Sequence, residues 1–213
     1  MGRIFRIDSP FCEVMNKLFD LIALNLAFLM CCIPIITIGA SCTALHTVAM
    51  KIAQGNDPHA VKGFLRAFRE NFRQASVTWL LLLVSGGFLY VDAVIASQLG
   101  TGGFLMRCLL GFLGILYLFV LLYIFPLQSR YNNTIRKNLQ NALLIAIRQL
   151  PKTILLAATI ILPLLAMMYG PVPVFLSCLI GFLLIGCSLI ACIQDRMIFN
   201  IFEHYEEMDS DTP

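Results

Sequence analysis

Runs of about 20 apolar residues constrain this chain more than any other feature. Hydrophobic residues fill 59% of the 213 positions and charged residues only 13%, about half of the roughly 25% that soluble domains carry. Inside lipid, backbone N–H and C=O groups need partners within their own segment, so such runs form α-helices. The sequence therefore predicts an all-α fold, a polytopic transmembrane helix bundle that forms one integral membrane domain over residues 1–213.

The apolar runs predict about five spans, and six is the alternative. They cover roughly residues 18–38, 75–97, 104–126, 153–169 and 174–193. The first run contains Pro34 and continues as a weaker apolar stretch to Ala53. One kinked span is the preferred interpretation, because two helices turning near Pro34–Ser41 would have only about 16 residues each, fewer than the roughly 17–25 that cross a bilayer. We expect this segment to be retained, since Asp8 and Glu13 do not suit a signal peptide.

Two basic segments, 58–73 and 132–150, carry apolar residues at helical spacing and predict two amphipathic cytoplasmic helices. Each helix either lies in the membrane interface or packs on the bundle as an ordinary loop helix. Their cations are predicted to contact anionic lipid or to dock a partner. These cations are Lys62, Arg66, Arg69, Arg73, Arg136, Lys137 and Arg148.

Lysine and arginine are distributed very unevenly among the loops. Five lie in the loop before the second span and five in the loop after the third, whereas the turns 98–103 and 170–173 have none. By the positive-inside rule, both basic loops and the acidic tail, 194–213, are cytoplasmic. Five spans would then place the N-terminus outside, which Arg3, Arg6 and Lys17 oppose. These three cations keep the six-span alternative open.

Asp92 and Arg107 are the ionisable residues inside the second and third spans. Charges in a bilayer are costly, and these two lie at similar depth on either side of the turn near Gly100. We predict an intramembrane ion pair between them. Solute or proton handling, and snorkelling of each side chain to the interface, are the alternatives.

Other polar residues gather in and after the first span. Asp20 and Asn25 beside the break at Pro34 could form a polar site in the bundle, since polar groups at broken helices bind ions or substrates in transporters. Hydrogen bonding between helices is the more common role of such residues. His46 stands alone near a span, and we interpret it as a packing or interface residue.

The sequence carries no catalytic signature. It has no nucleophile elbow, H-E-x-x-H, Walker A or G-x-G-x-x-G motif, and its eight cysteines include no C-x-x-C pair. We therefore predict a protein that is not an enzyme, with no cofactor and no metal. A net charge of +3, clustered in loops, does not suggest nucleic acid as a partner.

Several stretches together resemble the YesL family of bacterial membrane proteins, a family of unknown function. They are Asp8–Phe11, Asn25–Leu29, Ile33–Leu45, Phe68–Ala75 and Tyr131–Thr134, in the same order along nearly the whole chain. The resemblance implies a multi-pass protein of the bacterial cell membrane. It also implies an association with carbohydrate uptake, because such proteins are grouped with sugar ABC-transporter components and polysaccharide-degrading enzymes. It supplies no catalytic residues.

Two functions follow as expectations. The first is an accessory or regulatory component of carbohydrate uptake, whose partners are the lipid bilayer and sugar ABC-transporter subunits. The second is a permease-like subunit that moves solute itself. ABC permeases place a Glu-Ala-Ala…Gly coupling helix before a Leu-Pro, and here Asn141 to Pro151 has the Leu-Pro without the glutamate or the glycine. This departure weakens the permease interpretation.

Overall fold

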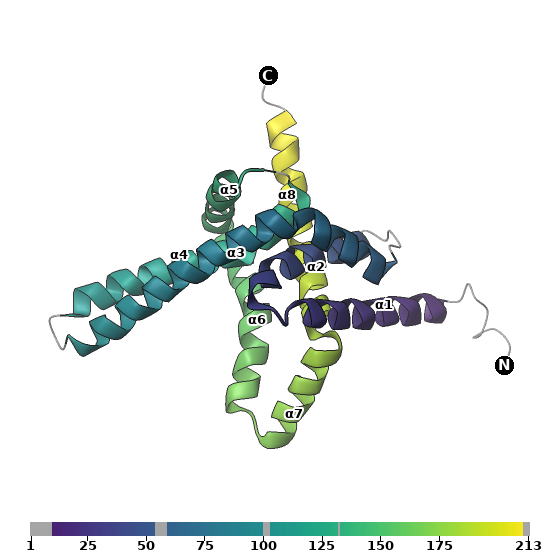
Figure 1. The fold of residues 1–213 in the computed structure, drawn as a ribbon, viewed down its shortest axis with the longest axis horizontal. Helices are drawn as coiled ribbons and strands as arrows, with labels where there is room; N and C mark the ends of the chain where they lie inside the picture. Colours follow the sequence, from purple (N-terminus) through teal and green to yellow (C-terminus); the bar gives the residue numbers. More distant parts are fainter. Residues whose placement is uncertain (1–9, 54–58, 100–102, 132, 211–213) are drawn as a thin grey trace.

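The computed structural model describes residues 10–53, 59–99, 103–131 and 133–210, with side chains described for 15–52, 59–99, 103–131 and 133–198. All regular structure in these ranges is helical, as predicted (Figure 1). The elements in chain order are α1 Pro10–Cys31, the 3₁₀ turn η1 Ile35–Thr37, α2 Ile38–Ala53, α3 Ala60–Gln98, α4 Phe104–Arg130, α5 Ile135–Arg148, α6 Leu150–Tyr169, α7 Val172–Gly181, the π-helical turn η3 Phe182–Gly186 and α8 Cys187–Ser210.

Five helical segments of the described chain are long and apolar enough to cross a membrane. They are Ile35–Ile52, Ala60–Gln98, Phe104–Arg130, Leu150–Tyr169 and Val172–Ile198. Four of them contain the spans predicted at 75–97, 104–126, 153–169 and 174–193. The first lies mostly beyond the predicted 18–38, so the bounds of that span were wrong.

The first apolar run forms two helices rather than one kinked span. Helix α1 ends at Cys31, and Pro34, three residues later, is extended, with φ −77° and ψ 126°. The Thr37 hydroxyl contacts the carbonyl oxygens of Cys31 and Pro34, at 2.6 and 2.7 Å, and so satisfies groups that the helix end leaves open. The two-helix alternative therefore holds, with α1 longer than the expected 16 residues.

Helices α3, α4 and α6 are longer or less interrupted than the predicted spans. The basic segment 58–73 and the second span belong to one 39-residue helix, α3, which is about 58 Å long. Helix α4 continues through Pro126, where the predicted span ended, to Arg130, and α6 continues through Pro163. A proline removes only one backbone hydrogen bond, and a membrane helix tolerates that loss. The amphipathic helix predicted at 132–150 is confirmed as α5.

Buried residues form two clusters that α8 joins. One cluster packs α1 and α2 on the first half of α3, with Leu24, Leu45 and Phe64 among its buried members. The other packs α4 on α5 and α6 around Tyr123 and Ile124. Ala191 of α8 belongs to the first cluster and Ile198 to the second. The last helix therefore holds the two halves of the fold together.

Two apolar hairpins project from this centre in different directions (Figure 1). One is the far part of α3 with α4, and the other is α6 with α7. Their side chains are strongly exposed, as at Leu105 and Tyr169, each 81% accessible. An apolar surface of this extent is far larger than soluble monomers expose and is suited to a bilayer. Residues 54–58 lie outside the described part of the chain, and so do residues 100–102 of the predicted turn 98–103.

Candidate functional site

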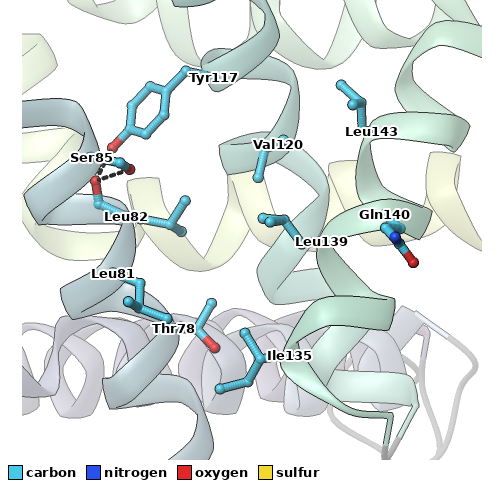
Figure 2. A pocket seen from close by; sticks show the side chains of 10 residues that line it. All are labelled: Thr78, Leu81, Leu82, Ser85, Tyr117, Val120, Ile135, Leu139, Gln140 and Leu143. Atoms are coloured by element: carbon cyan, nitrogen blue, oxygen red, sulfur yellow. Dashed lines mark hydrogen bonds between the residues drawn. The ribbon is translucent and has the colours of Figure 1, made fainter. Parts of the chain in front are cut away.

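An apolar cavity lies between α3, α4 and α5 (Figure 2). Its accessible volume is about 520 Å³, within the roughly 300–1,000 Å³ range of ligand pockets. The cavity exists because α5 packs on the end of α4 through Ala142, Ile145 and Ala146 and so stands beside α3. The lining residues are Thr78, Leu81, Leu82, Ser85, Tyr117, Val120, Ile135, Leu139, Gln140 and Leu143.

The Asn25 side chain clamps α1 to the π-helical turn η3. Its amide nitrogen donates to the carbonyl oxygens of Phe182 and Leu183, at 3.1 and 2.8 Å. Its amide oxygen accepts from the Ser188 N–H at 3.1 Å, and the Ser188 hydroxyl donates to the Leu21 carbonyl oxygen. A π-turn shifts the backbone bonding pattern of a helix, and Asn25 bonds backbone groups exposed by that shift. The amide is thus occupied as a link between helices.

His46 and Asp195 form a second polar contact, between α2 and α8. The distance from His46 Nδ1 to Asp195 Oδ1 is 2.9 Å, and the Asp195 side chain is fully buried. Asp195 Oδ2 is also buried and has no hydrogen-bond partner. Asp195 was assigned from the sequence to an acidic tail at 194–213, and the structure buries its side chain. Gln194 and Ile198 are buried as well, because α8 continues into the core.

Asp92 and Arg107, the predicted ion pair, both lie on the α3–α4 hairpin. Both side chains are exposed. Arg107 Nε donates to the Gly103 carbonyl oxygen at 3.4 Å. The pairing of Asp92 with Arg107 stays a prediction.

The residues predicted for a polar site lie at different places on α1 and in the turn after it. Asn25 is buried at the π-turn, Asp20 is partly buried one turn earlier on α1, and Pro34 is exposed in the α1–α2 turn. They therefore do not converge on a shared site. The predicted cations are all exposed, on α3 for the first four and on α5 for the last three, Arg136, Lys137 and Arg148.

Sequence reasoning missed Asp195, Ser188 and Tyr117. Asp195 follows an apolar run by two residues, a position that equally suits a solvated tail, so only the packing of α8 on α2 identifies it. Tyr117 is conspicuous once the fold is known, because its hydroxyl crosses to the Leu82 carbonyl oxygen of α3 at 2.9 Å. In the part of the chain that the structure describes, no three His, Cys, Asp or Glu side chains converge as a metal site.

Comparison with known proteins finds relatives of unknown function. A family model described as a protein of unknown function, DUF624, matches residues 21–93. The chain is 26% identical to the uncharacterized protein YesL of Bacillus subtilis (strain 168) over 205 residues, which cover 93% of this chain and 91% of that protein. The chain is YesL-like. The resemblance inferred from the sequence is thereby confirmed.

A second relative supports the same family. The uncharacterized protein YteU of Bacillus subtilis (strain 168) is 28% identical to this YesL-like chain over 185 residues, which cover 85% of the chain and 82% of the relative. No solved structure gives a significant match. Both relatives are described as uncharacterized, so neither name assigns an activity.

We expect Asn25→Leu to lower the stability of the folded protein. The substitution leaves two carbonyl oxygens and the Ser188 N–H buried without the partner that Asn25 supplies, at about 1–3 kcal/mol for each group. The loss of stability is measured by thermal unfolding in detergent, with the reaction of a thiol reagent at Cys42 and Cys187 as the signal for unfolding. Asn16→Leu is the matched control, because Asn16 lies on the same helix with its side chain exposed. Equal unfolding temperatures for the two variants would show that the Asn25 hydrogen bonds contribute nothing to stability.

Proposed function

We propose that this chain is a non-enzymatic accessory or regulatory component of bacterial carbohydrate uptake in the cell membrane. It would dock an acidic surface of a sugar ABC-transporter subunit. The docking surface is the α3 basic face, which we define as Lys62, Arg66, Arg69 and Arg73. The observation that carries the proposal is the continuity of α3, which joins this face to an apolar hairpin within one unbroken helix.

The α3 basic face has the composition of an interaction surface. Its four cations are exposed, and the exposed apolar residues Val61, Leu65 and Phe72 lie on the same half of the helix. Arg66 pairs with Glu70 at 2.9 Å, but both side chains are largely accessible, at 81% and 60%. Such an exposed pair is weak, so Arg66 can exchange Glu70 for an acidic partner.

A straight helix about 58 Å long exceeds a hydrocarbon core of about 30 Å by nearly half its length. The basic half of α3 would therefore extend beyond the membrane, and docking there would act on the packing of α1 and α2, whose buried residues share a cluster with Phe64. The link to carbohydrate uptake comes from the family resemblance alone.

The proposal requires the basic loops and the C-terminus to be cytoplasmic. Reporter fusions at Asn71 and Asn138 are expected to be cytoplasmic, and fusions within 100–103 external, because the basic loops hold the cations. A fusion at Gly2 decides between five spans and six, because a cytoplasmic N-terminus, which Arg3, Arg6 and Lys17 favour, requires an even number of spans. An external fusion at Asn71 would overturn both the orientation and the docking surface.

Replacing Arg66, Arg69 and Arg73 by glutamine tests docking. We expect at least a tenfold loss of the co-purifying transporter subunit, measured by quantitative mass spectrometry, with unchanged membrane insertion. The matched control replaces Arg136, Lys137 and Arg148 by glutamine, which removes the same charge from α5. Equal loss in both variants would mean that net charge, rather than the α3 basic face, holds the partner. Failed insertion of the α3 variant alone would assign its cations to topology.

The permease-like function remains the second candidate on one observation. Helix α5 lies between α4 and α6, and only Gln149 separates it from the Pro151 turn that opens α6. A short amphipathic helix between two membrane helices is where permeases couple to an ATPase. Solute flux by the purified chain in liposomes would favour this function over the accessory role.

A further inference from the structure

We propose that the cavity between α3, α4 and α5 holds one acyl chain of an anionic phospholipid, with the lipid phosphate at Arg136. This site does not depend on the α3 basic face, so it stands or falls separately from the proposed function. Its occupant follows from the chemistry of two adjoining pockets.

The first pocket is the apolar cavity of Figure 2, which offers methyl and methylene groups. Three hydroxyl groups in its lining are already engaged. Those of Tyr117 and Ser85 both donate to the Leu82 carbonyl oxygen, at 2.9 and 3.0 Å. The Thr78 hydroxyl donates to the Gln74 carbonyl oxygen and accepts from Gln128 Nε2. A sugar would lose its hydrogen bonds to water here without gaining hydrogen bonds to these hydroxyl groups, whereas a hydrocarbon chain needs no hydrogen bonds.

The second pocket is a shallow depression that is open to the surface and lies beside the first; we call it the polar pocket because four of its five lining residues have polar side chains. Its volume is about 570 Å³, and its lining consists of Gln74, Asn133, Thr134, Ile135 and Arg136. Ile135 lines both pockets, so the two adjoin at this side chain. Arg136 is the charged residue of this lining and is exposed. Its guanidinium suits a phosphate, which it can bind through two hydrogen bonds.

The start of α5 adds to this positive potential. Ile135 is the first residue of the helix, so the N-terminal end of the helix dipole faces the polar pocket. The preceding Thr134 makes no side-chain cap to the helix, which leaves first-turn amides open to an acceptor. With Arg136 in the lining, these amides make the pocket complementary to an anion.

The order of residues along α3 matches the shape of a lipid. Gln74 lines the polar pocket, and Thr78, Leu82 and Ser85 line the apolar one on successive turns. The distance from Gln74 to Ser85 along the helix axis is about 16 Å, comparable to much of an acyl chain. The same stretch of α3 is where its basic half gives way to its apolar half. A headgroup and a chain would therefore lie at the depths that a membrane gives them.

Native mass spectrometry of the full chain in mild detergent tests the site. With equal phosphatidylglycerol and phosphatidylcholine added, we expect one phosphatidylglycerol retained per chain at least tenfold over phosphatidylcholine. Leu143→Trp, which fills the cavity, should abolish this retention. Leu144→Trp, one residue along α5 on the exposed side, should preserve it. Arg136→Gln should reduce the preference at least fivefold, while the neighbouring Lys137→Gln leaves it intact.

Ser85→Phe is the second filling variant should Leu143→Trp fail to fold, because Ser85 also lines the cavity. Equal retention of the two lipids by the wild-type chain would overturn the proposal. So would retention that survives both filling variants, since the lipid would then lie elsewhere. Equal losses in Arg136→Gln and Lys137→Gln would refute the assignment of the phosphate to Arg136.

Discussion

His46→Leu is expected to destabilise the fold by about 1–3 kcal/mol, the cost of leaving a buried polar group without its hydrogen-bond partner. Asp195 is fully buried, and one of its oxygens already has no partner. Without His46 Nδ1 at 2.9 Å, the other oxygen would lose its hydrogen bond as well. Thermal unfolding in detergent measures the change. His59→Leu is the control, because His59 is exposed before the first residue of α3.

The double variant His46→Leu/Asp195→Leu tests whether the two side chains stabilise the fold as a pair or independently. Replacing both members of a buried pair by apolar residues is often neutral, so most of the lost stability should return. The coupling energy from the double-mutant cycle should exceed about 1 kcal/mol. Losses that simply add would show that the two side chains do not act as a pair.

Gly39→Ala is expected to loosen the contact between α2 and α3. A Cβ built on Gly39 would lie 2.5 Å from the Ala75 carbonyl oxygen and 2.5 Å from the Trp79 Cβ, so the two helices must separate. Overpacking of this kind costs about 1–3 kcal/mol, and Gly39→Leu should cost more. Trp79 also donates to the Ile35 carbonyl oxygen at 2.9 Å, so its fluorescence should report the displacement.

Gly87→Ala provides the opposite expectation within α3. A Cβ on Gly87 meets nothing within 4 Å, and alanine is favoured over glycine in a helix by up to about 1 kcal/mol. This variant should be as stable as the wild type or slightly more stable. If Gly39→Ala matched it in unfolding midpoint and tryptophan spectrum, the close approach of α2 and α3 would be refuted.

The candidate sites were only partly predictable, and the reason is the range of the interactions. Asn25 was named from its polarity inside an apolar run, but its partners Phe182 and Leu183 lie more than 150 positions away. His46 was interpreted as a packing or interface residue, because a single histidine in the sequence does not indicate that it contacts a carboxylate 149 positions away. The cavity requires α3, α4 and α5 to pack together, and none of the three helices encodes it alone.

The sequence by itself determined the all-α class, the membrane character and most of the apolar helices, because these depend on local hydropathy and on backbone bonding within each segment. It also placed the exposed cations of α3 and α5, since helical periodicity is a local property. Only the tertiary structure decided the break after Cys31, the continuity of α3, the π-turn at Phe182–Gly186 and the burial of Asp195. These features depend on whether a neighbouring helix supplies the missing hydrogen bonds and packing, and that neighbour is distant in the sequence.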